Sequence, residues 1–178
     1  MDERRREEES SPFRVLLVSE RAGKVSAIGG LQFSPDVTID DCPALDLLIV
    51  PGGWGTRTEI KNTTLLNWIA DRAAKTRLTA SVCTGSSLLG IAGLLDGHEA
   101  TTHWRAFHFL RDSVPRANIR KNVRFTLQNP IFTSAGVSAG IDLALRIVSH
   151  FFGIKIGRAT ALHMEYPYPQ TDLRRHKI

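Results

Sequence analysis

The sequence predicts an α/β three-layer sandwich with a mostly parallel sheet. Apolar strands alternate with helical segments from residue 13 onward, which is typical of a parallel sheet covered by helices. The segment DLLIV at residues 46–50 is an apolar run of the kind that is buried on both faces of such a sheet. A chain of 178 residues is long enough to enclose one such core.

The first twelve residues differ from the rest in composition. MDERRREEESSP is charged and ends in proline, so we expect residues 1–12 to form a disordered tail, neither a signal peptide nor an anchor. Residues 13–178 are expected to form a single domain. No apolar run approaches the ~20 residues that span a bilayer, so no membrane partner is expected.

The cysteines and the net charge indicate the redox environment and the partners to expect. Cys42 and Cys83 lie far apart and give neither a disulfide framework nor a metal-ligand spacing, so we expect no metal, free thiols and a reducing cytoplasm. The net charge of +5 comes from scattered basic residues, apart from LRRHK at 173–177. This pattern favours a solvated basic surface over a nucleic-acid site.

The first half of the expected domain contains four strands and one helix. The strands are short and bounded by turn residues, and the helix has apolar residues at helical spacing. The expected strands are 13–19, two within 24–36 separated by Gly29-Gly30, and 46–50, and the expected helix is 64–75.

The second half continues the alternation. Asn129-Pro130 separates two short apolar runs and suggests a hairpin. Gly153 is suited to end the long helix that is expected at 136–153. That helix is expected to carry Ile141, Leu145, Val148 and Phe152 on one apolar stripe. The expected strands are 78–82, 123–128 and 131–135, and the expected helices are 85–95, 105–114, 136–153 and 155–165.

Two turn segments mark the place where a site should form. Sites in open α/β sheets lie beyond the carboxyl ends of the strands. PGG at 51–53 follows the strand at 46–50, and CTG at 83–85 follows the strand at 78–82. We therefore expect both segments to face a substrate.

Cys83 occupies the join between a strand and a helix. A nucleophile elbow needs small residues two positions either side of the nucleophile, and Ser81 and Gly85 meet that need. The helix N-terminus would favour the thiolate, while N–H groups of Thr84 and of Gly52 or Gly53 would face developing negative charge. The same position also suits a small, buried core cysteine, and the local pattern does not separate the two interpretations.

Other candidate groups are weaker on local pattern alone. His103, in ATTHW, re-emerges from the sheet after the elbow helix and is a possible general base, although any one histidine is more often a packing or surface residue. Cys42 has no comparable setting. Asp142 is an acidic residue within an apolar helix, and we expect a backbone or cap contact to satisfy it.

Taken together, several motifs resemble a known family. They cover nearly all of residues 13–169, and they are LLIVPGG, SVCTGSSLLGIAGLLDG, ATTHW, IFTSAGVSAGIDLALRIV and ALHMEYP. In this order they resemble the ThiJ/PfpI superfamily, which is related to class I glutamine amidotransferases. VCTG followed by ATTHW looks most like the isonitrile hydratase group, and the sensor domains of AraC-type regulators share the pattern.

The resemblance implies a flavodoxin-like sandwich and a cysteine chemistry. Cys83 matches the nucleophile and Thr84 the residue after it, Gly53 matches the glycine whose N–H helps to bind negative charge, and His103 matches the histidine near the thiol. It further implies a homodimer, a small-molecule substrate or ligand, and no cofactor. The implied reaction is the hydration of an isonitrile to an N-substituted formamide through a thioimidate on Cys83.

In one respect the chain departs from the family pattern. Family members have a strand and a helix before the segment that FRVLLVS matches, and that helix carries an acid hydrogen-bonded to the cysteine; we expect both elements to be missing here. Their absence would leave strand edges unpaired and apolar side chains exposed. It also keeps open a catalytically impaired ligand- or redox-sensing domain.

Another amidase, protease or deglycase activity is a further alternative. Protease-like members tend to have His directly after the cysteine, where this chain has Thr84. A complete AraC-type regulator is not expected, because only QTDLRRHKI follows MEYPYP.

Overall fold

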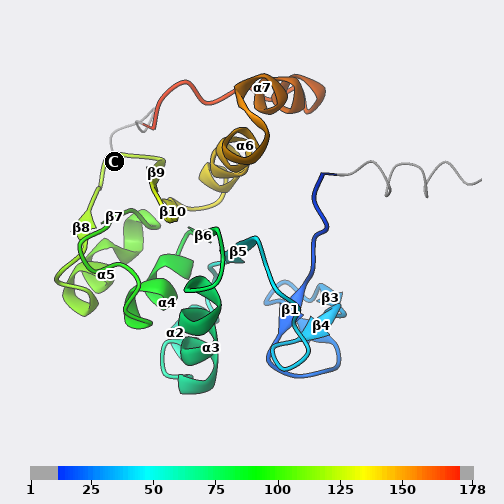
Figure 1. Cartoon of the computed structure of the whole chain (residues 1–178). Coiled ribbons are helices and arrows are strands. Elements are labelled where there is room, and N and C mark those ends of the chain that lie inside the picture. Colours follow the sequence, from blue (N-terminus) through cyan, green and yellow to red (C-terminus); the bar gives the residue numbers. More distant parts are fainter. Residues whose placement is uncertain (1–11, 173–178) are drawn as a thin grey trace, which may run out of the picture. The chain divides into compact units, whose positions relative to one another are not determined.

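The computed structural model describes residues 12–172 of the chain (Figure 1). It contains two compact units, divided between Pro43 and Ala44. Residues 1–11 of the expected tail and the basic segment after Asp172 lie outside the described residues. One domain over 13–178 stays a prediction.

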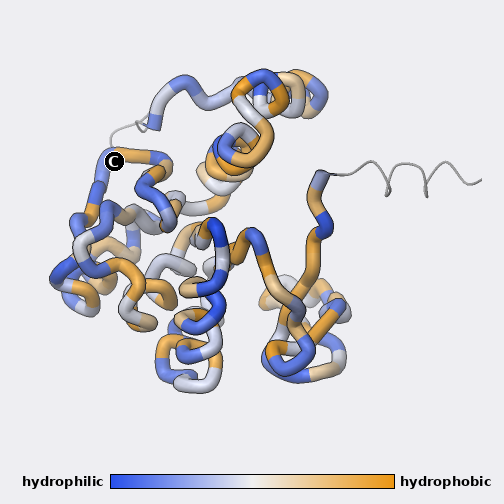
Figure 2. Tube along the Cα trace, in the orientation of Figure 1, coloured by the Kyte–Doolittle hydropathy of each residue, from blue (hydrophilic) through white to orange (hydrophobic). Residues whose placement is uncertain are grey.

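The first unit consists of two small strand pairs. β1 (Val18–Ser19) pairs in parallel with β4 (Val37–Thr38), and β2 (Val25–Ser26) pairs antiparallel with β3 (Gln32–Phe33). A turn at Gly30, whose φ is +85°, connects β2 to β3, as the Gly29-Gly30 pair predicted. β1 is much shorter than the strand expected at 13–19, although that segment is apolar in all but a few positions (Figure 2).

The second unit is built on a four-stranded sheet with the order β5-β6-β10-β9. β5 (Leu47–Val50), β6 (Leu78–Val82) and β10 (Ile131–Ser134) are parallel, and β9 (Phe125–Gln128) joins β10 as an antiparallel hairpin across Asn129-Pro130. The predicted α/β class with a mostly parallel sheet is confirmed. β5 lies at the end of this strand order, and Ile49 is 46% exposed.

Helices cover both faces of this sheet. The helices of this unit are α2 (Thr56–Glu59), α3 (Thr63–Ala73), α4 (Gly85–Ile91), α5 (Phe107–Ser113), α6 (Ala139–Phe152), α7 (Ile154–His163) and the 3-10 helix η1 (Trp104–Ala106). Neighbouring residues of a strand point to opposite faces. Ile131 joins a core with α3, α4 and α5, while the next residue, Phe132, contacts His150 of α6.

Several of the expected helices differ from the structure in detail. α4 ends at Ile91, short of residue 95, because the backbone turns at Gly93 with φ +82° and delivers Leu95 to the core. The stripe expected on α6 is wrong for Ile141 and Phe152, which are both 38% exposed. α6 packs against α7 as well as the sheet, so its buried positions are spread around the helix.

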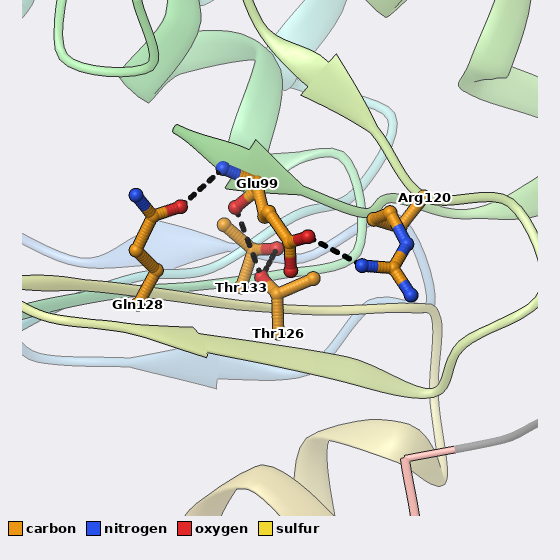
Figure 3. Close-up of polar contacts among 5 residues, drawn as sticks. All are labelled: Glu99, Arg120, Thr126, Gln128 and Thr133. Carbon is orange, nitrogen blue, oxygen red and sulfur yellow. Dashed lines mark hydrogen bonds and ion pairs between the residues drawn. The ribbon is translucent and has the colours of Figure 1, made fainter. Parts of the chain in front are cut away.

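Side chains attach a further strand pair to the sheet. β7 (Glu99–Ala100) pairs in parallel with β8 (Asn118–Ile119). Figure 3 shows that Gln128 accepts a hydrogen bond from the Glu99 N–H and that the Thr126 hydroxyl donates to the Glu99 carbonyl. Because β7 runs directly into Thr101–His103, these contacts fix the start of a segment of the candidate site.

Among residues 12–172, no helix is long and apolar enough to cross a membrane.

Candidate active site

Cys83 has the backbone of a nucleophile elbow. Its φ is +59°, in the left-handed region that costs a non-glycine residue roughly 1–2 kcal/mol. Three hydrogen bonds hold this conformation. The Cys83 N–H donates to the Ser134 carbonyl at 3.1 Å, and the Cys83 carbonyl accepts from the hydroxyls of Ser86 (3.1 Å) and Thr102 (3.0 Å).

Two glycines allow the chain to pack tightly around this turn. A Cβ added at Gly85 would lie 2.2 Å from the Val50 carbonyl oxygen, so α4 starts in direct contact with the end of β5. A Cβ added at Gly52 would lie 2.6 Å from the Thr84 nitrogen and 2.8 Å from the Cys83 Cβ. The PGG and CTG segments are therefore brought together, as the rule for the carboxyl ends of strands predicted.

Thr84 links the two segments through its hydroxyl. The Gly53 N–H donates to Thr84 Oγ1 at 2.9 Å, and Thr84 Oγ1 lies 3.2 Å from the Gly53 carbonyl oxygen. Thr56 donates to that same carbonyl at 2.8 Å and lies 3.1 Å from Thr84 Oγ1. In this conformation the N–H of Gly53 is directed at a hydroxyl of the protein itself.

Sequence reasoning missed Thr56. It lies in the short helix α2, which no periodicity predicted, and it is buried. The available signal was its position at the end of the turn-rich PGGWGT segment, within reach of the predicted site.

His103 lies next to the elbow through its neighbour Thr102, whose hydroxyl binds the Cys83 carbonyl. Its Nδ1 accepts the Arg105 N–H at 3.3 Å, which places the proton of a neutral ring on Nε2. The Cδ2 edge of the ring faces Gly136, where an added Cβ would be 2.4 Å from His103 Cδ2. The ring thus meets the backbone at two points of its edge, Nδ1 and Cδ2.

The thiol of Cys83 is partly exposed, and its Sγ has no hydrogen-bond partner among residues 12–172. No carboxylate of this described part of the chain therefore contacts it. Cys42, by contrast, is buried in the first unit, with its Sγ 3.6 Å from the Pro43 carbonyl oxygen. Only Cys83 of the two has the setting of a nucleophile.

Asp142 is satisfied differently from the expected backbone or cap contact. Its side chain is buried, forms an ion pair with Arg124 and accepts a hydrogen bond from the Tyr166 hydroxyl at 2.9 Å. Burial, together with that hydrogen bond, raises the pKa of Tyr166 above its usual value. This cluster joins α6 to the segment after α7, and the contacts give Asp142 a structural role.

No group of three or more His, Cys, Asp or Glu side chains within residues 12–172 is arranged to hold a metal ion.

A parallel α/β sheet that presents a left-handed cysteine between a strand and a helix defines a class of nucleophile-elbow proteins. Within that class, the chain belongs to the DJ-1/PfpI family, whose model matches residues 5–150.

Individual relatives include enzymes and regulators. The chain is 39% identical over 160 residues to an isonitrile hydratase of Pseudomonas putida, a match that covers 89% of this chain and 69% of that protein. It is 32% identical over 136 residues to the HTH-type transcriptional regulator GbdR of Pseudomonas aeruginosa, which covers 76% of this chain and 36% of the regulator. The chain thus spans about two thirds of the hydratase and about a third of the regulator.

Solved structures agree on the fold. A ThiJ/PfpI family protein from Pseudomonas syringae superposes with a TM-score of 0.80 at 33% identity, covering 89% of this chain and 66% of that one. An AraC family transcriptional regulator from Pseudomonas putida superposes with a TM-score of 0.77 at 24% identity, covering 87% of this chain and 83% of the other. The second likeness shows the fold alone.

Proposed function

We propose that the protein hydrates isonitriles to N-substituted formamides with Cys83 as the nucleophile. The observation that carries this proposal is the left-handed Cys83 at the end of β6, held by three hydrogen bonds and presented with a partly exposed thiol. The 39% identity to an isonitrile hydratase supports the choice of substrate class.

The reaction divides into two steps. The Cys83 thiolate attacks the terminal carbon of R–N≡C, a C–S bond forms, and that carbon takes a proton to give the thioimidate R–N=CH–S–Cys83. Water then adds to the same carbon, the nitrogen is protonated, and the C–S bond breaks to release R–NH–CHO and the thiolate. Covalent catalysis replaces one difficult addition of water with two easier additions.

In this proposal the groups around the elbow have separate roles. His103, with its proton on Nε2, donates to the substrate carbon and later takes a proton from the attacking water. The N–H groups of Thr84, Gly52 and Gly53 stabilise negative charge on the reacting atoms. For Gly53 to do so, the Thr84 hydroxyl must first turn away from its N–H.

Product formation tests the proposal. The purified chain should convert cyclohexyl isocyanide to N-cyclohexylformamide, measured by chromatography and mass spectrometry. Cys83→Ala should form no product above the rate without protein, while Cys42→Ala, which changes the other thiol, should retain the activity of the unmodified chain. Equal product from the Cys83→Ala protein would contradict the proposal.

A second candidate is a ligand-sensing domain that binds a small molecule without turnover. The engaged N–H of Gly53 favours it, because that donor is occupied by Thr84 before any ligand arrives. The likeness to HTH-type regulators supports it as well. In this case cyclohexyl isocyanide would raise the midpoint of thermal unfolding while no formamide accumulates.

We further propose a cytoplasmic homodimer with a small-molecule substrate or ligand and no nucleic-acid partner. Light scattering coupled to size-exclusion chromatography tests the dimer, since a monomer mass at micromolar concentration would contradict it.

A further inference from the structure

A pocket lies at the opposite end of the sheet from Cys83. It is an open cavity of about 380 Å³ beside the Asn129-Pro130 turn, where β9 ends and β10 begins. The elbow lies at the other end of β10, where the Ser134 carbonyl receives the Cys83 N–H. The length of β10 separates the two sites, so this pocket takes no part in the proposed reaction at Cys83.

Arg146 provides the positive charge of this pocket. A guanidinium has five N–H donors, and within residues 12–172 Arg146 makes one long hydrogen bond, 3.5 Å, to the Tyr168 hydroxyl. The same part of the chain offers it no carboxylate, and no Asp or Glu lines the cavity. Arg146 is partly buried beside the rings of Phe125 and Tyr168, which limit its movement.

The hydroxyl groups of the pocket are already committed. Ser149 Oγ donates to the Leu145 carbonyl at 2.9 Å, so the Tyr168 hydroxyl, 2.8 Å away, donates to Ser149. The Tyr168 oxygen is then left to accept from Arg146. These successive hydrogen bonds hold Tyr168 in place. Arg146 therefore remains a hydrogen-bond donor toward the pocket, and few acceptors compete for its N–H groups.

The rest of the lining is mixed, with the polar side chains of Asn129 and His150 beside three apolar ones. Phe132 forms a buried floor, Leu127 and Ile154 form partly exposed sides, and the ring of His150 stands edge-on to Phe132 with 5.3 Å between centroids. A cluster of three apolar side chains beside a single arginine suits a ligand with one negative charge and a flat apolar body. A phosphate, with two charges and no apolar part, suits them less well.

We propose that this pocket is a binding site for small aromatic monocarboxylates, in which the Arg146 guanidinium binds the carboxylate and Phe132, Leu127 and Ile154 contact the ring. Two parallel N–H···O bonds between guanidinium and carboxylate would supply both affinity and orientation. The site is independent of Cys83 and of the proposed hydration.

Titration of the full chain with sodium benzoate, followed by ¹H–¹⁵N NMR at constant ionic strength, tests the proposal. Benzoate should shift the amide resonances of Leu127, Ser149 and Ile154, with an affinity in the millimolar range. Benzamide, which has the same shape without the charge, should bind about tenfold or more weakly, the loss expected for a charge-assisted hydrogen bond.

Substitutions identify the cation. Arg146→Gln should weaken benzoate binding about tenfold or more. The matched control is Arg158→Gln, because Arg158 stacks on Tyr168 at 5.9 Å without lining the pocket, and it should bind within about twofold of the unmodified chain. If Arg146→Gln fails to fold, Arg146→Lys and Arg158→Lys replace the pair, and the former should still bind several-fold more weakly.

Three results would overturn the proposal. These are equal affinities for benzoate and benzamide, equal effects of the Arg146 and Arg158 substitutions, and shifts scattered over the surface.

Discussion

Gly85→Ala is the substitution that most directly perturbs the packing of the elbow. The added methyl carbon would lie 2.2 Å from the Val50 carbonyl oxygen and 2.9 Å from the carbonyl carbon of Pro51. Ordinary van der Waals contact begins at 3.4 Å, so the start of α4 and the end of β5 must separate by about 1.2 Å. Both groups are backbone, and neither can move aside by changing a rotamer.

The size of the effect follows from this geometry. Overpacking a rigid site costs about 1–3 kcal/mol or more, and here the displaced atoms belong to a sheet and a helix. We therefore expect Gly85→Ala to lower the free energy of unfolding by about 2–3 kcal/mol. The separation should also disturb the contact between Gly52 and Thr84 and reduce the reactivity of Cys83.

Gly55→Ala is the matched control. It is the same chemical change in the neighbouring turn, with no atom within 4 Å of the added Cβ and an α-helical φ of −59°. This variant should be neutral or stabilised by up to about 1 kcal/mol. Urea unfolding monitored by circular dichroism measures both, and equal stabilities for the two variants would refute the packing argument.

Three further predictions follow from single residues. Cys83→Gly should be more stable than Cys83→Ala in urea unfolding, because relief of about 1–2 kcal/mol at φ +59° outweighs the roughly 0.4–1 kcal/mol by which glycine favours the unfolded chain. Tyr166→Phe should destabilise the protein by about 1 kcal/mol at neutral pH. Since the folded state raises the pKa of Tyr166, its contribution is present below pH ~10 and is lost as the pH rises through the folded pKa, so unfolding curves of the two proteins should converge at high pH. Iodoacetamide should alkylate Cys83 before Cys42 in peptide mapping, because Cys42 is only 5% exposed; alkylation of both thiols at one rate would contradict the burial of Cys42.

Local sequence signals predicted much of the sheet. β6 occupies residues 78–82 as expected, because a short apolar run bounded by turns has few alternatives. The hairpin of β9 and β10 formed across Asn129-Pro130, and Gly153 ends α6 with φ +87°. In each of these cases the residues that determine the structure are adjacent in sequence.

Other features depend on distant partners and carried no local signal. β7 and β8 have two residues each and are too short to show a period; Gln128 and Thr126, nearly thirty residues away, hold β7 in place. Asp142 looked isolated in its helix because its partners, Arg124 and Tyr166, come from segments on either side of α6 in the sequence. The bond between Gly53 and Thr84 could likewise not be predicted from either motif alone.

The central claim is that Cys83 converts isonitriles, and ¹³C NMR with cyclohexyl isocyanide labelled at its terminal carbon tests it most directly. With the unmodified chain and with Cys42→Ala, the label should move from the isonitrile resonance to the formyl resonance of N-cyclohexylformamide. With Cys83→Ala it should stay in the isonitrile. A label that stays in the isonitrile with the unmodified, folded chain, or that moves equally with Cys83→Ala, would contradict the account.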